Sequence, residues 1–109
     1  AVTIQVPRKP RRLTRCNCSF CRRSGGLFAY FDRTQVKIVA RRGALARYVW
    51  GDRCIAHCRC ATCGSLTHWL PIGRASSRMG VNFRNFEPSV IESIRIRNFD
   101  GADTWKFLD

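Results

Sequence analysis

Acidic residues, histidines and long apolar runs are all scarce in this sequence. Asp and Glu together number 7 and His 2, against 20 Lys and Arg, which gives a net charge of +13 over 109 residues. No apolar run approaches the roughly 20 residues that a helix needs to cross a membrane, and no signal peptide is visible. The sequence therefore indicates neither a membrane protein nor a secreted one, and we expect a cytoplasmic, reducing setting.

Helical periodicity is also scarce, and the length suits a single domain spanning residues 1–109. Short stretches that alternate apolar with polar residues, or that are continuously apolar, predict strands instead. These stretches are Ala1–Val6, Leu27–Phe31, Val36–Val39, Ala44–Trp50, Cys54–His57, Leu66–Leu70, Met79–Phe83 and Ile94–Phe99. One helical turn is expected within Phe86–Ile91, beginning at Pro88. The fold class expected is mainly β, with Cys60–Cys63 at a tight knuckle between strands and Cys16–Cys21 on a loop near the surface.

The cysteines carry the strongest motif. One spacing, C-x-C-x-x-C, occurs twice, first at Cys16, Cys18 and Cys21 and again at Cys58, Cys60 and Cys63. A C-x-x-C turn presents two thiolates to one zinc ion, and a cysteine two residues upstream adds a third. Three protein ligands with an open fourth position are typical of a reactive zinc, whereas four closed ligands are typical of a structural one. The odd total of 7 cysteines favours metal binding over disulfides.

The spacing alone leaves the number of sites open. A single closed zinc site could use one C-x-x-C pair from each motif, Cys18 and Cys21 with Cys60 and Cys63. Two separate zinc positions are the alternative. Cys54 and Cys58 are most simply buried thiols. His57 and His68 stand beside aromatic or strand residues and are expected to pack rather than to bind metal.

The basic residues suggest an anionic partner. Most of them lie in the first 84 residues, where only Asp32 and Asp52 oppose them. Nucleic acid is one such partner, and a small carboxylate ligand is another, because the arginine guanidinium binds carboxylates through two parallel hydrogen bonds. A solvated surface without any specific partner would give the same composition.

Several segments together resemble one family, the glutathione-dependent formaldehyde-activating enzymes, whose domain centromere protein V shares. These segments are Cys16–Arg23 followed by Gly25 and Gly26, Tyr48–Asp52, Cys60–Gly64, Thr67–Trp69 with Pro71, Val81–Arg84 and Phe99–Gly101. They follow the family's order and cover nearly the whole chain. The resemblance implies a β-rich fold of several small, coiled antiparallel sheets around zinc knuckles.

The resemblance also implies two zinc positions. A structural zinc would use Cys60 and Cys63 together with a C-x-C near the N-terminus. A second zinc, at Cys16, Cys18 and Cys21, would be the catalytic site. The sequence begins at Ala1 without that N-terminal C-x-C, so we expect the native protein to have a few more residues upstream.

The activity implied is a carbon–sulfur lyase activity that joins glutathione and formaldehyde to S-(hydroxymethyl)glutathione. The candidate substrate-binding residues are Arg22, Arg23, Asn82 and Arg84. Asn82 and Arg84 would share one face of a strand, where they either support the fold or line a pocket. No general base is evident. A nucleic-acid-binding zinc module is the runner-up, and a non-catalytic zinc- or thiol-binding protein, such as a metal sensor or redox switch, is a further alternative.

Overall fold

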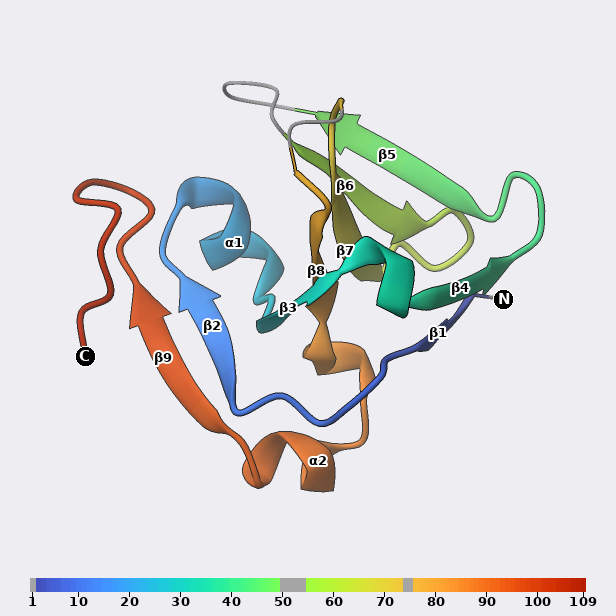
Figure 1. Cartoon of the computed structure of the whole chain (residues 1–109). Coiled ribbons are helices and arrows are strands. Elements are labelled where there is room, and N and C mark those ends of the chain that lie inside the picture. The colour runs from blue at the N-terminus through green and yellow to red at the C-terminus, as the bar shows by residue number, and fades with distance from the viewer. Residues whose placement is uncertain (1, 50–54, 74–75) are drawn as a thin grey trace. The chain divides into compact units, whose positions relative to one another are not determined.

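The computed structural model describes residues 2–49, 55–73 and 76–109, and Trp50 and Cys54 therefore lie outside the described residues. The chain is mainly β, as expected (Figure 1). The strands are β1 (Val2–Gln5), β2 (Arg12–Cys16), β3 (Phe28–Asp32), β4 (Lys37–Ala40), β5 (Leu45–Val49), β6 (Ile55–Cys60), β7 (Leu66–Pro71), β8 (Arg78–Asn82) and β9 (Arg95–Phe99). The helices are short: α1 (Ser19–Ser24), α2 (Pro88–Glu92) and the 3-10 turns η1 (Arg33–Gln35) and η2 (Phe83–Asn85).

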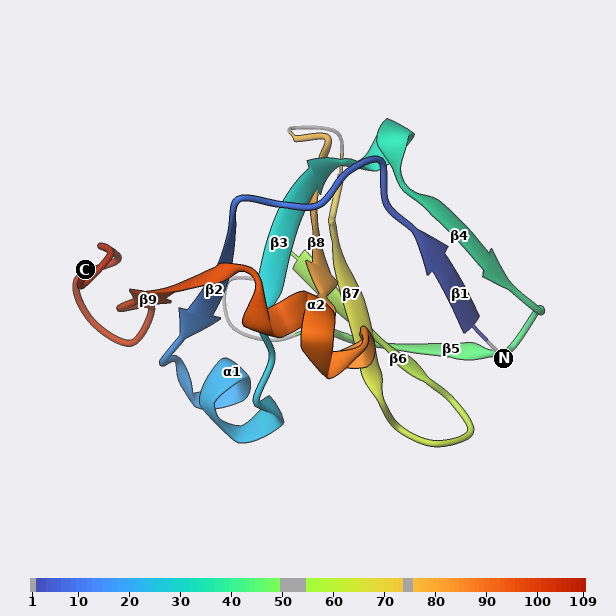
Figure 2. The ribbon, with the colours of Figure 1, turned by 90° about the horizontal axis from the view of Figure 1, so that it is seen from below.

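The chain divides into two compact units. Unit 1 comprises Ala1–Lys9 and Tyr30–Val81, and unit 2 comprises Pro10–Ala29 and Asn82–Asp109. In unit 1, β1 and β4 form an antiparallel ribbon in which Val2 pairs with Ala40 (Figure 2). The strands β5, β6, β7 and β8 are hydrogen-bonded in that order, as an antiparallel meander.

Unit 2 is built on β2. This strand pairs antiparallel with β3 at Thr14 and Phe28, and parallel with β9 along its whole length. The other strand pairings are antiparallel, as expected, and the pairing of β2 with β9 is the parallel one among the described strands. This parallel pairing brings the end of β2 beside the end of β9, with Cys16 opposite Phe99. Residues more than 80 positions apart in the chain therefore meet at one end of unit 2.

A glycine fixes the packing of the meander in unit 1. On β8, a Cβ added at Gly80 would overlap the indole of Trp69 on β7. The two residues are register partners, so the absence of a side chain at Gly80 leaves room for the indole of Trp69. The ring of Trp69 then reaches Tyr30, 6.0 Å away between centroids. The aromatic residue of the Thr67–Trp69 segment is thus part of the packing of unit 1.

Two local predictions were wrong. The segment from Cys16 to Cys21 is not a surface loop, because Cys16 ends β2 and Cys21 belongs to α1. Asn82 and Arg84 do not share a strand face, because β8 ends at Asn82 and Arg84 lies in η2. The expected tight knuckle at Cys60–Cys63, between two strands, is confirmed.

Among the described residues, the structure has no helix long and apolar enough to cross a membrane.

Candidate metal centre and its pocket

The first cysteine motif is shaped by the start of α1. Cys18 is the N-cap of this helix, and its sulfur accepts a hydrogen bond from the backbone N–H of Cys21 at 3.4 Å. The helix ends at Gly25, whose φ of 69° and N–H bond to the Cys21 carbonyl form a left-handed C-cap. The short helix turns the three cysteines toward one point.

The sulfurs of Cys16, Cys18 and Cys21 all lie within 4.8 Å of one another, so this cluster can hold a metal ion. Thiolates on one tetrahedral zinc, at about 2.3 Å from the ion, are about 3.8 Å apart, and the cluster fits that requirement. Backbone N–H groups also point at the sulfurs, as the Cys18 N–H does at Cys16 Sγ from 3.5 Å. Such bonds stabilise the thiolate form that a metal requires.

The thiols of Cys16 and Cys21 influence each other's pKa. A hydrogen bond from the Cys21 thiol, together with backbone N–H groups at Cys18 and Gly101, lowers the pKa of Cys16 to about 5. The same interaction with Cys16, together with burial, raises the pKa of Cys21. Without a metal, the cluster therefore holds a thiolate at Cys16 and keeps a proton at Cys21. A metal cation would replace that proton.

The segment after β9 braces the cluster. The side chain of Asn17 donates to Asp100 at 3.0 Å and accepts from the Ala102 N–H at 3.0 Å. Gly101 lies directly against Cys16, where an added Cβ would overlap the sulfur. The Phe99–Gly101 segment of the sequence thus has a definite role, which is to enclose Cys16.

A pocket of about 310 Å³ adjoins the cluster within unit 2. Two of the three cysteines line it, together with arginines, glycines and apolar side chains. The lining residues are Arg15, Cys16, Asn17, Cys21, Arg22, Gly25, Gly26, Arg84, Asn98, Phe99 and Leu108. A metal ion held by the cysteines would be next to a basic pocket of small-ligand size.

The structure separates the four candidate substrate-binding residues into two pairs. Arg22 and Arg84 line the pocket, and Arg23 and Asn82 do not. Asn82 is buried, and its side-chain oxygen accepts hydrogen bonds from the N–H groups of Leu27 and Arg84, both at 3.1 Å. Asn82 therefore supports the fold, which was one of its two expected roles.

Sequence reasoning missed Arg15, which lines the pocket beside Cys16. The residue lies on β2, and its place in the pocket depends on the pairing of β2 with β9. The sequence signal that could have indicated this role is the position of Arg15 directly before Cys16, the first cysteine of the motif.

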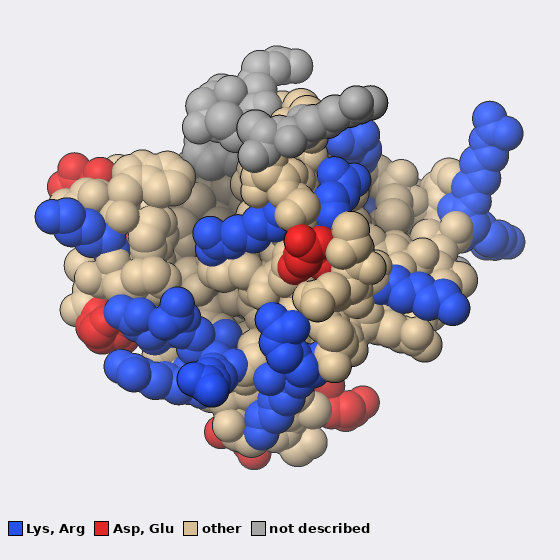
Figure 3. All heavy atoms as spheres, viewed as in Figure 1, with Lys and Arg blue, Asp and Glu red and all other residues tan. Residues whose placement is uncertain are grey.

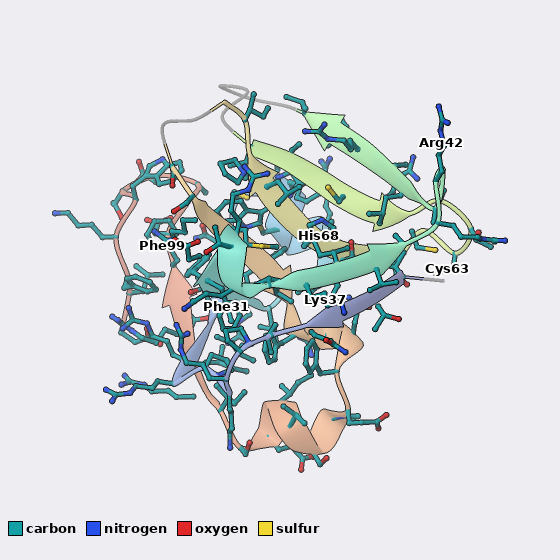
Figure 4. All side chains as sticks on the ribbon, turned by 45° about the vertical axis from the view of Figure 1, so that its right-hand side comes forward. Phe31, Lys37, Arg42, Cys63, His68 and Phe99 are labelled. Atoms are coloured by element: carbon teal, nitrogen blue, oxygen red, sulfur yellow. The ribbon has the colours of Figure 1, made fainter. Side chains whose placement is uncertain are left out.

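The second cysteine motif lies in unit 1. Cys60 ends β6, and backbone hydrogen bonds from Gly64 N–H to the Cys60 carbonyl and from Cys60 N–H to the Ser65 carbonyl, both 2.9 Å, close a tight turn. The sulfur of Cys63 is exposed. Hydrogen bonds with Ser65, and to a smaller extent one with the Cys60 thiol, lower the pKa of Cys63 to about 7. Cys63 and Arg42 both line a pocket of about 550 Å³, and Figure 4 shows the Arg42 side chain extending away from Cys63.

The remaining thiol and the histidines are buried in unit 1. Burial raises the pKa of Cys58 and lowers the pKa of both His57 and His68 to about 4. The hydroxyl of Thr67 donates its one hydrogen to the Cys58 carbonyl at 3.0 Å. Its oxygen therefore accepts the hydrogen bond that joins it to Nδ1 of His68 at 2.8 Å. Within the described part of the chain, neither histidine joins a group of three or more potential metal ligands, in agreement with the expected packing role.

Cysteine spacing, a three-sulfur cluster and an adjoining basic pocket define the site as a candidate metal centre. No protein-family model and no curated protein matches the chain. A crystal structure of a Rhodobacter sphaeroides protein from a structural-genomics programme is similar to it, with a TM-score of 0.68 and 26% sequence identity. The match covers 87% of this chain and 89% of that chain. The chain thus shares its fold with a protein of known structure whose description names no activity.

Proposed function

We propose that this chain belongs with the glutathione-dependent formaldehyde-activating enzymes that its motifs resemble, and that it is a zinc-dependent carbon–sulfur lyase. The observation that carries this proposal is the cluster of Cys16, Cys18 and Cys21, which opens beside a pocket with three arginines. Three sulfurs leave a fourth tetrahedral position for a ligand, and the pocket supplies positive charge for an anionic one.

Zinc is the metal that suits an all-thiolate cluster with tetrahedral spacing, and when bound it lowers the pKa of a thiol that joins it. The reaction adds the glutathione thiolate to the formaldehyde carbon. One carbon–sulfur bond forms, the carbonyl π bond breaks, and the oxygen takes a proton from water. No histidine or carboxylate lines the pocket within the described residues, so the contribution of the protein is to orient the thiol and to stabilise the negative charge on oxygen.

The arginines of the pocket are the groups that can orient the thiol and stabilise the negative charge on oxygen. Arg22, in α1, is exposed, and within the described chain it makes no side-chain hydrogen bond. Its guanidinium is therefore able to approach either a carboxylate of glutathione or the developing oxyanion.

Replacement of Cys18 by serine tests this proposal. Serine is a preferred N-cap residue, so Cys18→Ser keeps the cap of α1 and removes one sulfur of the cluster. We expect the variant to fold and to lose glutathione-dependent consumption of formaldehyde, followed by NMR against the uncatalysed reaction. Cys58→Ser is a control, since Cys58 is outside the cluster. A folded Cys18→Ser protein with full activity would place the chemistry elsewhere, and an unfolded one would favour a purely structural metal.

Nucleic-acid binding remains the second candidate, and one observation favours it. Arg12 and Arg95 are register partners on β2 and β9, and the exposed Trp105 follows in the same unit. Figure 3 shows Lys and Arg side chains gathered over the part of this face that β2 and β9 occupy. Binding through phosphates would weaken steeply between 50 and 200 mM salt, so an oligonucleotide titration at the two concentrations tests it.

A further inference from the structure

Arg15 and Arg84 are held in the same way on the wall of the pocket. The Nε–H of Arg15 donates to the side-chain oxygen of Asn98 at 2.8 Å, and the Nε–H of Arg84 donates to the Gly25 carbonyl at 2.9 Å. Across the described residues, neither guanidinium makes a hydrogen bond through its Nη atoms. Each arginine is thus anchored through one donor and keeps its other four N–H groups for a ligand.

The anchor of Arg15 is itself fixed. Arg15 and Asn98 are register partners of β2 and β9. The backbone N–H and the side-chain NH₂ of Asn98 donate to the two carboxylate oxygens of Asp109, each at 3.1 Å. Arg97 donates to the Asp109 carbonyl at 2.6 Å. This chain of contacts orients the Asn98 oxygen toward Arg15, so the guanidinium is positioned before a ligand arrives.

Two anchored guanidiniums in one pocket fit two carboxylates better than one, because each can bind a carboxylate with two parallel hydrogen bonds. No acidic side chain lines the pocket to compete for them within the described residues. Both line the same cavity as Cys16 and Cys21.

We propose that this pocket selects a ligand that carries two separate carboxylates, one bound by Arg15 and the other by Arg84. The inference rests on the proposed function only for the third group of the ligand, the thiol that would meet the cysteine cluster. Asn98 is a positioning residue in this scheme, acting through Arg15. A thiol with a single carboxylate would leave one guanidinium without its partner and would bind more weakly.

The test is a thermodynamic cycle between ligand and protein. Calorimetry measures the binding of two ligands to the purified protein of known metal content. The ligands are reduced glutathione and its glycine monoethyl ester, which lacks one carboxylate. The variants are Arg15→Gln and Arg84→Gln. Arg23→Gln is the matched control, because Arg23 is an exposed arginine of α1 that does not line the pocket. All four proteins are compared at the same salt concentration, because general electrostatic attraction depends on it.

We expect the ester to bind the unaltered protein about tenfold more weakly than glutathione, the usual effect of losing one charge-assisted contact. One of the two pocket variants should then bind glutathione and the ester equally, because it lacks the arginine that the missing carboxylate would contact. The other pocket variant and Arg23→Gln should keep the tenfold preference.

Three results would overturn the proposal: no binding of glutathione to the unaltered protein, a full ester penalty in both pocket variants, or an equal loss in Arg23→Gln. If Arg15→Gln does not fold, Arg15→Lys keeps the charge without the paired N–H groups, and a full ester penalty in both Arg15→Lys and Arg84→Gln is again contradictory. Formaldehyde consumption is measured separately. Binding with the expected pattern but without turnover would refute the proposed reaction and not this inference. Turnover without the expected binding pattern would refute this inference and not the proposed reaction.

Discussion

The sulfur of Cys16 lies so close to the backbone of Gly101 that residue 101 has no room for a side chain. We expect Gly101→Ala to displace Cys16 from the cluster and to lower the metal content of the purified protein. The overpacking should also destabilise unit 2 by about 1–3 kcal/mol. Elemental analysis and urea unfolding measure the two effects.

Gly25→Ala is the comparison for that variant. A Cβ at Gly25 would meet nothing within 4 Å, but its φ of 69° is left-handed. The substitution should cost about 1 kcal/mol of stability through backbone strain and leave the metal content unchanged. Equal metal loss in both variants would show that the Gly101 contact has no particular role.

Asn82→Ala should destabilise the protein without a direct effect on the pocket. The side-chain oxygen satisfies two backbone N–H groups, those of Leu27 and Arg84. Leaving such groups without an acceptor costs about 1–3 kcal/mol each when they are buried, and Leu27 is fully buried. Urea unfolding should therefore show a loss of about 1–3 kcal/mol, mainly from the Leu27 N–H. A loss of ligand affinity with unchanged stability would instead place Asn82 among the binding residues.

Stability should fall as the pH is lowered through the range from about 6.5 to 4. The buried His57 and His68 have a pKa of about 4 in the folded chain, against the ordinary 6.5 when unfolded. Between these values the unfolded state binds more protons, so acid favours unfolding. For His68, which is 1% exposed, the effect is on the order of 3 kcal/mol.

Thermal unfolding between pH 4 and 7 measures this effect. In His68→Gln the pH dependence should be shallower than in the unaltered protein, although His57 still contributes. Stability that is constant from pH 7 to 4, or that rises, would contradict the assignment of buried neutral histidines.

Removal of the metal should lower the unfolding temperature, because the binding energy of the cluster adds to the folding energy. With a strong chelator we expect a decrease of roughly 10 °C or more. Added zinc should restore it. An unchanged unfolding temperature, together with no metal in freshly purified protein, would contradict the metal centre itself.

The sequence predicted most strands to within two residues and missed features that depend on distant contacts. Pro88 marked the start of α2 correctly, because proline is suited to the first turn of a helix. The helix α1 was missed because six residues are too few to show helical periodicity, and its cap is a cysteine sulfur. The strand β6 extends to Cys60, beyond its predicted end at His57, because it pairs with neighbours on both sides.

For the candidate site, the sequence likewise predicted the residues that are close in the chain and missed those that depend on distant contacts. Spacing alone placed the three cysteines together, since they are close in the chain. Arg15 could not be assigned to the pocket, because its orientation depends on Asn98, 83 residues away. Arg23 neighbours Arg22 but does not line the pocket, a difference set by the direction of side chains around α1. The predicted zinc role of Cys60 and Cys63 stays a prediction.

The number of sulfur ligands around the bound metal, which we propose is zinc, tests the central claim most directly. It is measured by X-ray absorption before and after saturation with glutathione. We predict a rise in the average sulfur count per zinc in the unaltered protein, because the glutathione sulfur would complete the cluster of Cys16, Cys18 and Cys21. The rise should be absent for glutathione whose sulfur is methylated. Zinc that already has four sulfur ligands, with a count unchanged by glutathione, would contradict the account.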